Sequence, residues 1–353
     1  MAANLDFYRN KRILVTGHTG FKGTWLCWLL SSLGAKVYGY ALPAQPGNLY
    51  EQSKPPMSGV CLADIRSSRE IEQVLLQFEP ELVFHLAAHS VIDGSYDYPE
   101  SIFEINLMGT VRLLESIRRD GCGIPVVVVT SDKCYTQKLN GCSCREDDPL
   151  GAAEAYSASK ACQDLAAQCY QYSFPELRVA VARASNTVGG GDFNASRLIP
   201  YLLDCFFSGR TAQLRNPNFV RPWQYVLDVL RGYLMLGKAL AEGELKDSTI
   251  FNFGPRSDGF QTVACVAEIL GGYFPNACWE WIGAAATKET EVLRLDSGKA
   301  ERSLGWRPIY SLEETLAQAA GFRTGLSSRS AQELCREQVE QFLERTETGE
   351  AAE

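Results

Sequence analysis

The stretch RILVTGHTGFKG, residues 12–23, sets an apolar run directly before a turn that carries three glycines. An apolar, β-branched run that ends in a glycine-rich turn and continues with helical period is typical of the first strand and helix of a doubly wound sheet. We therefore expect a strand over 12–17, a helix over 21–35 and a second strand over 36–42. The glycines of the turn are Gly17, Gly20 and Gly23.

The alternation of strand and helix continues outward from this stretch. The sequence predicts strands over 81–88 and 124–131, a helix over about 99–119, and later a helix over 227–240 and a strand over 248–254. Because the strand runs are apolar without alternation, helices should cover both faces of the sheet. The expected fold class is α/β, with a doubly wound, mainly parallel sheet of the Rossmann type.

Beyond residue 185, clusters of glycine, proline and polar residues interrupt the apolar segments, and loops of this kind commonly bind ligands. We expect two domains whose segments interleave. A nucleotide-binding domain would comprise 1–185 and about 222–254, and a smaller substrate domain would comprise about 186–221 and 255–330. Residues 331–353 should form an amphipathic helix with a polar, acidic end.

Composition and charge exclude several classes of protein. The chain has 353 residues, enough for about two domains, and its 46% apolar and 22% charged residues are average for a globular protein. A net charge of −8 argues against a partner that is nucleic acid or a membrane surface. No apolar run reaches the roughly 18 residues of a membrane helix, and the first residues lack the apolar core of a signal peptide. We therefore expect a cytoplasmic protein.

Twelve cysteines are scattered through predicted helices and strands, and we expect reduced thiols rather than a disulfide framework. Cys142 and Cys144 lack the C-x-x-C spacing of a zinc site, and no histidine lies near them. The sequence therefore predicts no metal.

The glycine turn indicates a dinucleotide site, because a pyrophosphate meets the helix N-terminus at this point of the fold and the backbone must approach it without a Cβ. The spacing is G-x-x-G-x-x-G, and a tight turn without a ligand is the alternative. The second strand ends with neither an acid nor an arginine, and the missing positive charge favours NAD over NADP. Asp64 and Ile65 follow the next short strand, where they could contact the adenine or form a plain surface turn.

Tyr156 and Lys160 form Y-x-x-x-K, and a four-residue step on a helix puts both side chains on one face. A neighbouring ammonium lowers the pKa of a phenol, which would make Tyr156 a base near neutral pH. The pattern is common and is not specific by itself. Asp132 and Lys133 follow a buried strand, where α/β sheets place their ligands, although a solvent-exposed ion pair is the alternative there.

Several motifs together carry a family resemblance over about residues 1–320. In this order and spacing, the chain resembles the extended short-chain dehydrogenase/reductase superfamily through TGHTGFKG (16–23), HLAA (85–88), Asn106, YSASK (156–160) and RPWQYV (221–226). Within it, the chain is most similar to the CDP-D-glucose 4,6-dehydratases through GFKGTW (20–25), TSDKCY (130–135), NTVGGGD (186–192) and RLIP (197–200). The dTDP-glucose and GDP-mannose dehydratases typically carry Thr-Asp-Glu where this chain has Ser131, Asp132 and Lys133.

The resemblance implies NAD as cofactor, a nucleotide-diphosphate hexose as substrate, and the loss of water from the sugar. It implies that Tyr156 removes the proton of the C4 hydroxyl while hydride leaves C4. Lys160 then lowers the pKa of Tyr156 and holds the nicotinamide ribose, and Ser131 hydrogen-bonds the 4-hydroxyl. Asp132 protonates the departing C6 hydroxyl, Lys133 acts at C5, and the hydride returns to C6. An acid donor must be protonated at the working pH, and a lysine base must be neutral.

The resemblance also implies which residues bind the ligands. The cofactor would contact Gly17, Thr19, Gly20, Phe21, Lys22, Gly23, Asp64, Ile65, Leu86, Ala87, Ala88, Asn106, Tyr156 and Lys160. The substrate would contact Asn186, Arg197, Leu198, Arg215 and Arg221. Asn106 would support the site from inside a distorted helix, with a helix cap as the alternative. Arg221 would pair with the substrate diphosphate, because a guanidinium suits phosphate geometry, whereas Arg197 and Arg215 could equally lie at the surface.

The chain departs from the family pattern beside the expected cleft. His89 and Asp93 stand where the CDP-glucose enzymes usually have a glutamine and a basic residue. CSCRE (142–146), with Cys142–Cys144, replaces WGYRE, and EAYS (154–157), with Glu154–Ala155, replaces DPYS. These departures leave open which nucleotide and which hexose are accepted.

Other functions remain alternatives. A nucleotide-sugar 4-epimerase, or a dehydratase for another hexose, could use the same scaffold, but an epimerase needs no acid at C6, so Asp132 and Lys133 favour dehydration. A non-catalytic NAD-binding regulator is a second alternative, because fold does not fix function. The family also implies a homodimer through helices about 99–119 and 154–172, with packing inside one domain as the alternative for these helices.

Overall fold

The computed structural model describes residues 5–89, 98–120, 123–136, 141–151, 153–245, 248–283 and 290–348. Its centre is a seven-stranded sheet in the order β10-β6-β5-β4-β1-β2-β3, and every neighbouring pair in it is parallel. The strands are β1 (Arg12–Thr16), β2 (Lys36–Ala41), β3 (Gly59–Leu62), β4 (Leu82–His85), β5 (Val126–Val129), β6 (Val179–Ala184) and β10 (Ile250–Phe253). The predicted α/β class is confirmed.

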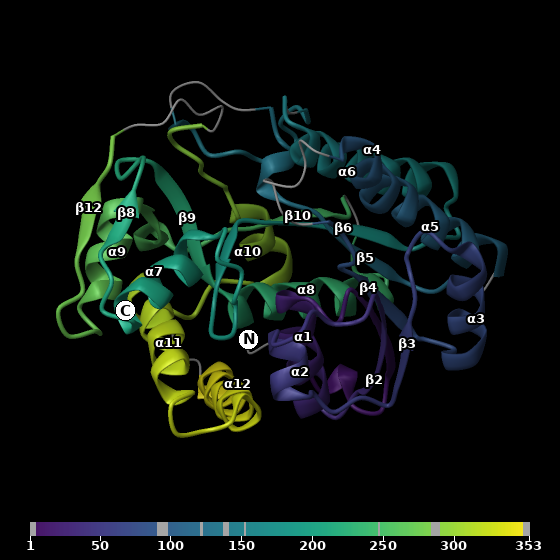
Figure 1. Ribbon diagram of the computed structural model, residues 1–353. Helices are drawn as coiled ribbons and strands as arrows, with labels where there is room; N and C mark the ends of the chain where they lie inside the picture. Colours follow the sequence, from purple (N-terminus) through teal and green to yellow (C-terminus); the bar gives the residue numbers. More distant parts are fainter. Residues whose placement is uncertain are drawn as a thin grey trace.

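Helices cover both faces of this sheet, which explains why its strands are apolar at every position (Figure 1). Successive residues of β1 enter opposite cores: Ile13 and Val15 pack with the first, and Leu14 packs with the second. The first face carries α1 (Phe21–Ser32), α2 (Leu49–Ser53) and α8 (Val226–Ala241). The other face carries α3 (Ser68–Phe78), α5 (Gly109–Asp120) and α6 (Ala155–Ser173), and α4 (Pro99–Phe103) packs against α6.

Two small sheets lie beside the large one, at the left of Figure 1. One joins β7 (Asn186–Val188), β9 (Val220–Tyr225) and β11 (Phe260–Thr262), and the other pairs β8 (Ala212–Leu214) with β12 (Trp279–Trp281). Four helices follow or separate these strands: α7 (Leu198–Phe207), α9 (Val263–Gly271), α10 (Gly298–Leu304) and α11 (Leu312–Gly325). A third apolar cluster, separate from the two that flank the large sheet, is the core of α7, α9 and α11, whereas α10 packs against β10 and α8.

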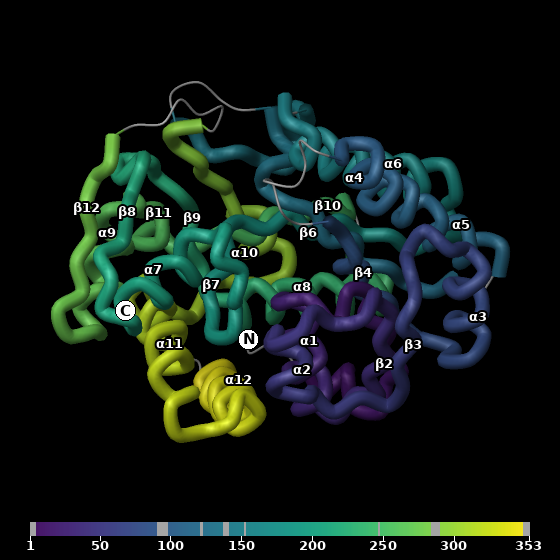
Figure 2. The backbone as a smooth tube through the Cα atoms, in the orientation of Figure 1, coloured from purple at the N-terminus to yellow at the C-terminus, as the bar shows by residue number. Residues whose placement is uncertain are grey.

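The last helix, α12 (Ala331–Thr348), packs against α1 and α2, as the tube in Figure 2 shows. The predicted helix of the C-terminal segment is therefore present, and residues 349–353 of that prediction lie outside the described part. Trp25 of α1 packs against Phe322 of α11 at a ring distance of 6.2 Å, and its indole donates to the Gly190 carbonyl at 2.9 Å. The first helix thus contacts both the C-terminal helices and the start of the smaller part.

Some predicted bounds differ from the structure. The helix expected over 99–119 is interrupted by a π-helical turn, Glu104–Met108, which separates α4 from α5. The strand expected over 81–88 leaves the sheet after His85. The other helical turns in the part of the chain that the structure describes are Leu5–Tyr8, Asp132–Cys134 and Ser257–Gly259.

Within the described residues, no helix combines the length and the apolar character needed to cross a membrane. The same part of the chain holds no cluster of three or more histidine, cysteine or acidic side chains suited to a metal ion.

Candidate active site

A cavity of about 1090 Å³ opens at the carboxyl ends of the parallel strands, across the point between β1 and β4 where the strand order reverses. Every residue predicted to bind cofactor or substrate or to act in catalysis lines it, with the exception of Asn106. The cofactor set there is Gly17, Thr19, Gly20, Phe21, Lys22, Gly23, Asp64, Ile65, Leu86, Ala87, Ala88, Tyr156 and Lys160. The remaining predicted residues are Ser131, Asp132, Lys133, Asn186, Arg197, Leu198, Arg215 and Arg221.

The glycine turn forms a backbone cradle at the start of α1. Gly17 has φ +73°, and a Cβ there would lie 2.7 Å from the nitrogen of Ala87. A Cβ on Gly23 would lie 2.1 Å from the carbonyl oxygen of Gly17. Gly20 is the N-cap of α1, and no side chain caps this helix end. The cradle therefore fits a dinucleotide pyrophosphate, which needs close backbone approach and the N–H groups of a helix start.

Beside the cradle, the neighbouring strand β2 ends at Ala41 without an acid or an arginine, as the sequence indicates. Asp64 is paired with Arg66 at 2.6 Å, and this hydrogen-bonded guanidinium lowers the pKa of the Asp64 carboxyl. The Tyr40 hydroxyl donates to the Asp64 carbonyl at 2.6 Å, which fixes the turn that Asp64 and Ile65 form in the cavity wall.

Ser131, Asp132 and Lys133 occupy the turn that follows β5. The Ser131 hydroxyl donates to Asp132 Oδ1 at 3.0 Å and accepts the Lys133 N–H at 3.2 Å. Asp132 is 3% exposed, and burial raises the pKa of its carboxyl, although Lys133 and Ser131 act in the opposite direction. Its Oδ2 is buried and has no hydrogen-bond partner among the described residues. These are the properties of a proton donor.

Tyr156 and Lys160 lie one turn apart on α6, whose first turn is capped by the Glu154 carboxylate. The Ser131 side chain acts on the Tyr156 phenol in the direction that lowers its pKa, so the two side chains lie close together beside the β5 turn. The predicted lowering of the Tyr156 pKa is wrong for this structure: burial raises it to about 12, and the negative charge of Asp132 acts in the same direction.

The ammonium of Lys160, which is expected from the sequence to lower the Tyr156 pKa, is hydrogen-bonded to other groups. It donates to Gln163 Oε1 at 2.8 Å and to the Val129 carbonyl at 3.3 Å. Burial lowers the pKa of Lys160 to about 7, and the charge of Lys22 contributes. A neutral form of Lys160 is therefore within reach at physiological pH.

Asn106 supports the cavity from behind rather than lining it. It is fully buried in the π-helical turn, where Oδ1 accepts the His89 N–H at 2.8 Å and Nδ2 donates to Ser159 Oγ at 2.8 Å. The distorted helix expected around Asn106 is present. Through His89, Asn106 fixes the segment after β4 that forms part of the cavity wall.

The residues predicted for the substrate lie at the side of the smaller sheets. Arg221 is 9% exposed, stacks on the Phe219 ring at 5.1 Å and donates to the Glu291 carbonyl at 3.2 Å. Arg197 pairs with Asp192 at 2.9 Å, whereas Arg215 is exposed on the rim. Asn186 begins β7 and Leu198 begins α7, and both are half-buried in the cavity wall.

Among the described departures from the family pattern, one residue lines this cavity and the others are not among its lining residues. His89 lines it, and Asp93 lies outside the described residues. Cys144 is buried and its carbonyl accepts a hydrogen bond from Asn252, whereas Cys142 is exposed. Glu154 keeps the capping role expected of an acid at a helix start, with Ala155 as the first helical residue.

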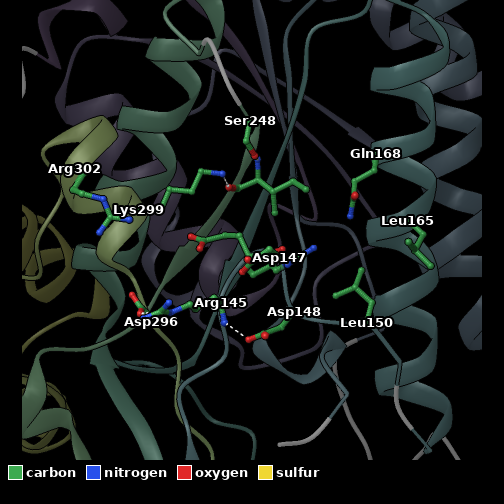
Figure 3. A pocket seen from close by; sticks show the side chains of 13 residues that line it. Arg145, Asp147, Asp148, Leu150, Leu165, Gln168, Ser248, Asp296, Lys299 and Arg302 are labelled. Atoms are coloured by element: carbon green, nitrogen blue, oxygen red, sulfur yellow. Dashed lines mark hydrogen bonds and ion pairs between the residues drawn. The ribbon is translucent and has the colours of Figure 1, made fainter.

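A second cavity, of about 800 Å³, lies between the loop at 145–150, α6, the start of β10 and α10 (Figure 3). Several of its charged groups are engaged with neighbours: Arg145 pairs with Asp296 at 3.1 Å, and Lys299 donates to the Ile250 carbonyl at 2.6 Å. Since the predicted reactive residues line the first cavity, we place the chemistry there.

Comparison with known proteins agrees with the site. A model of the NAD dependent epimerase/dehydratase family matches residues 13–254. The chain is 37% identical to CDP-glucose 4,6-dehydratase of Salmonella typhimurium, over 89% of this chain and 90% of that protein. It is 28% identical to a probable dTDP-glucose 4,6-dehydratase of Sinorhizobium fredii, over 84% and 88% of the two chains.

Solved structures show the same fold. A dTDP-glucose 4,6-dehydratase from Bacillus anthracis in complex with NAD has a TM-score of 0.75 at 24% identity and covers 88% of this chain and 96% of its own. A UDP-glucose 4-epimerase from Thermotoga maritima with UDP-glucose has a TM-score of 0.76 at 22% identity and covers 90% and 99%. From the family match over residues 13–254 and the near full-length relative at 37% identity, the chain belongs to the NAD dependent epimerase/dehydratase family.

Proposed function

We propose that the protein is a nucleotide-sugar 4,6-dehydratase that converts CDP-D-glucose to CDP-4-dehydro-6-deoxy-D-glucose and water. The observation that carries the proposal is the meeting of Asp132 and Lys133 with Tyr156 in one cavity wall. Tyr156 and Lys160 alone would serve oxidation at C4, whereas a buried carboxyl with a raised pKa adds an acid that an epimerase does not need. The relative at 37% identity supports CDP-glucose as the substrate.

The backbone cradle at Gly17, Gly20 and Gly23 would hold the NAD pyrophosphate, Asp64 and Ile65 would adjoin the adenine, and Lys160 would hold the nicotinamide ribose. Bound there, NAD would supply a hydride acceptor for C4 of the sugar and a hydride donor for C6. The site need not release the cofactor between turnovers, because oxidation and reduction balance within one reaction.

The chain's own residues then move the protons. Tyr156 takes the proton of the C4 hydroxyl, which Ser131 helps to orient, and C4 becomes a ketone. Lys133 removes the C5 proton, which the ketone acidifies, while Asp132 protonates the C6 hydroxyl so that it leaves as water. A proton returns to C5 when C6 is reduced. Because the pKa of Asp132 is raised by burial, its protonated form is more available than that of an exposed carboxyl.

The cavity wall formed by the smaller sheets would hold the nucleotide sugar. Arg221 would pair with the diphosphate, and the half-buried Asn186 and Leu198 would adjoin the sugar and nucleotide. We propose the division expected from the sequence, with 1–185 and about 222–254 for the cofactor and about 186–221 and 255–330 for the substrate. The C-terminal helix packs on the cofactor part.

We also propose a homodimer through α4, α5 and α6. Leu165 is 53% exposed and Tyr172 is 90% exposed on α6, so the helix presents apolar surface that a second copy could cover. Light scattering at micromolar concentration should report a dimer, and a monomer would contradict this. The eleven cysteines in the described part are free thiols, which supports a cytoplasmic location.

The test is turnover of CDP-, dTDP-, GDP- and UDP-hexoses with NAD, followed by mass spectrometry and NMR. We expect CDP-glucose to give a product lighter by one water, and CDP-glucose deuterated at C4 to give deuterium at C6. Inversion at C4 without loss of water would establish the 4-epimerase instead. Loss of water from another nucleotide sugar alone would move the proposal to that substrate, and no turnover of any sugar would favour the NAD-binding regulator.

A further inference from the structure

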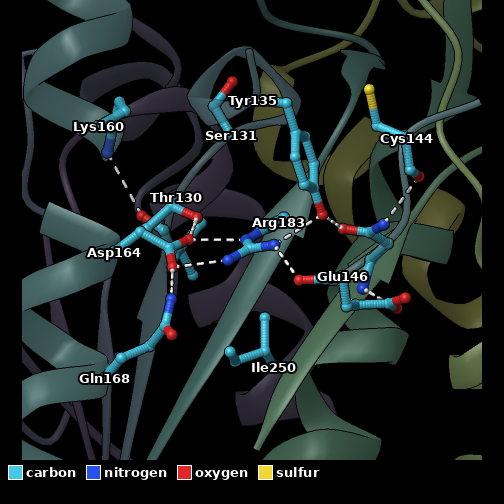
Figure 4. Close-up of polar contacts among 12 residues, drawn as sticks. Thr130, Ser131, Tyr135, Cys144, Glu146, Lys160, Asp164, Gln168, Arg183 and Ile250 are labelled. Carbon is cyan, nitrogen blue, oxygen red and sulfur yellow. Dashed lines mark hydrogen bonds and ion pairs between the residues drawn. The ribbon is translucent and has the colours of Figure 1, made fainter. Parts of the chain in front are cut away.

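A buried ion pair connects the two elements that carry the reactive groups. Asp164 of α6 and Arg183 of β6 are at most 1% exposed and form two hydrogen bonds, each 2.8 Å long (Figure 4). A buried ion pair recovers its desolvation cost only when its geometry is good and its remaining groups are bonded, and it is weak support for stability as such.

The pair holds both ends of the reactive turn. At one end, the Thr130 hydroxyl donates to Asp164 Oδ2 at 3.0 Å. At the other end, Arg183 donates to the Tyr135 hydroxyl at 2.7 Å and lies 4.8 Å from the centre of the Tyr135 ring. Thr130 and Tyr135 bracket the segment 131–134, so the turn that carries Asp132 is fixed on both sides by one ion pair.

The same pair also belongs to the helix of Tyr156. Tyr156, Lys160 and Asp164 follow one another at four-residue steps, so they lie along one face of α6. The ion pair therefore sets the distance between this face and the reactive turn.

The network around the pair is well satisfied. Asp164 Oδ1 also accepts from Gln168 at 2.6 Å, Tyr135 donates to Asn252 at 2.6 Å, and Arg183 donates to the Glu146 carbonyl at 3.0 Å. A connected, satisfied network of this kind is rigid. It ends at the wall of the second cavity, which Glu146, Gln168 and Arg183 line.

We propose that Asp164 and Arg183 are positioning residues that hold the turn of Asp132 and Lys133 in register with Tyr156, so that elimination at C6 follows oxidation at C4. The effect on chemistry rests on the proposed dehydratase function. Loosening the turn should affect the acid and base on it more than Tyr156 and Lys160 on α6, because a small misplacement of a reacting group has a large effect on its rate.

The test uses variants that loosen the turn without leaving a buried charge alone. Tyr135→Phe keeps the ring beside Arg183 and removes its hydroxyl, and Thr130→Val keeps the side-chain shape and removes the bond to Asp164. Each should slow loss of water about tenfold and slow C4 oxidation by a smaller factor, because Ser131 on the same turn only orients the hydroxyl that Tyr156 deprotonates, so that NADH accumulates in a single turnover. Tyr8→Phe is the matched control, since it removes a buried hydroxyl that donates to the Leu234 carbonyl at 2.6 Å, away from the site.

Amide hydrogen exchange gives a readout that needs no activity. The amides of Lys133 and Cys134 are bonded to Ser131, and their exchange should be faster in both variants and unchanged in Tyr8→Phe. Parent-like exchange, or equal slowing of oxidation and elimination, would overturn the proposal. If the parent turns over no nucleotide sugar, the dehydratase function fails, and exchange at these two amides still decides whether the network holds the turn.

Discussion

The ammonium of Lys160 lies 2.8 Å from the side-chain oxygen of Gln163, and this contact starts a buried chain of hydrogen bonds that leads from α6 through α5 and β4 to β1. Gln163 donates to Thr110 at 2.9 Å, His85 Nε2 lies 2.8 Å from the same hydroxyl, and His85 Nδ1 lies 2.8 Å from the Thr16 hydroxyl. These hydrogen bonds connect Lys160 with Thr16, the residue directly before Gly17, and so join the Y-x-x-x-K helix to the cofactor cradle.

The number of protons that each group can donate fixes the direction of every hydrogen bond in this series. Thr110 has one hydroxyl proton, which it donates to the Asn106 carbonyl at 2.8 Å, so His85 Nε2 must be the donor to Thr110. His85 Nδ1 then accepts from Thr16. Burial lowers the pKa of His85 to about 3, in agreement with a neutral ring.

Replacing Gln163 should change the ionisation of Lys160. Gln163→Leu removes an acceptor from the ammonium and should lower the Lys160 pKa further below about 7, whereas Gln163→Glu adds a negative charge and should raise it. The other charged groups near Lys160 are Lys22 and Asp164, with the thiol of Cys134. In a plot of kcat/KM against pH, the limb that reports the Lys160 pKa should move in opposite directions in the two variants. An unmoved limb in both would show that Gln163 does not act on Lys160.

Lys160 should also lower the stability of the fold at neutral pH. Its pKa falls from a usual value of 10.5 to about 7, so between these values the unfolded chain binds more protons than the folded one. Stability should therefore rise with pH across this window. Lys160→Met should be inactive and yet more stable at pH 7 by on the order of 1 kcal/mol or more, with a smaller gain near pH 10. Thermal melts at both pH values, with the exposed Lys36→Met as control, measure this, and a loss of stability at pH 7 would refute it.

Tyr156→Phe should abolish turnover while fold and NAD binding persist, because only a hydroxyl is lost. We expect kcat to fall by about 10²–10⁴-fold, the usual share of general acid–base catalysis. Calorimetric titration with NAD and circular dichroism serve as controls. Retention of more than a small part of the activity would remove Tyr156 from its assigned role.

The contact between α11 and α1 should be a main support of the fold. Phe322 is 1% exposed, packs on Trp25 and leaves no room for a side chain at Gly190, where a Cβ would lie 2.1 Å from Phe322 Cγ. Phe322→Ala should lower the free energy of unfolding by about 3–5 kcal/mol. The exposed Phe193→Ala is the control, and urea unfolding measures both. If both variants lowered the free energy of unfolding by the same small amount, the C-terminal helices would not be coupled to α1.

The sequence predicts the large sheet and the glycine cradle because both depend on local chemistry. An unbroken apolar run needs cover on two faces, and Gly17 adopts a backbone conformation that other residues rarely reach. The small sheets depend on pairing between strands of three to six residues that are distant in the chain, such as β8 with β12, and no local pattern indicates them.

The expectations from the sequence do not include the buried polar networks behind the site, those of Asp164 with Arg183 and of Gln163 with Lys160. Arg183 is a charged residue inside the apolar strand VAVARA, and Asp164 continues the four-residue series of Tyr156 and Lys160; together these features indicate a buried ion pair. Gln163 carries no such signal. The raised pKa of Tyr156 could not be predicted either, because it depends on burial and on where Lys160 points.

The dehydratase mechanism is tested most sharply by a single turnover of Asp132→Asn with CDP-glucose. The amide keeps the size of the carboxyl and removes the acid, so elimination at C6 should slow by about 10²–10⁴-fold while oxidation at C4 continues. Absorbance should show NADH that forms and persists, since its return to C6 waits for water to leave. Loss of water at the parent rate would contradict the role of Asp132 and favour the epimerase, and absence of NADH would show that Asp132 serves binding or oxidation instead.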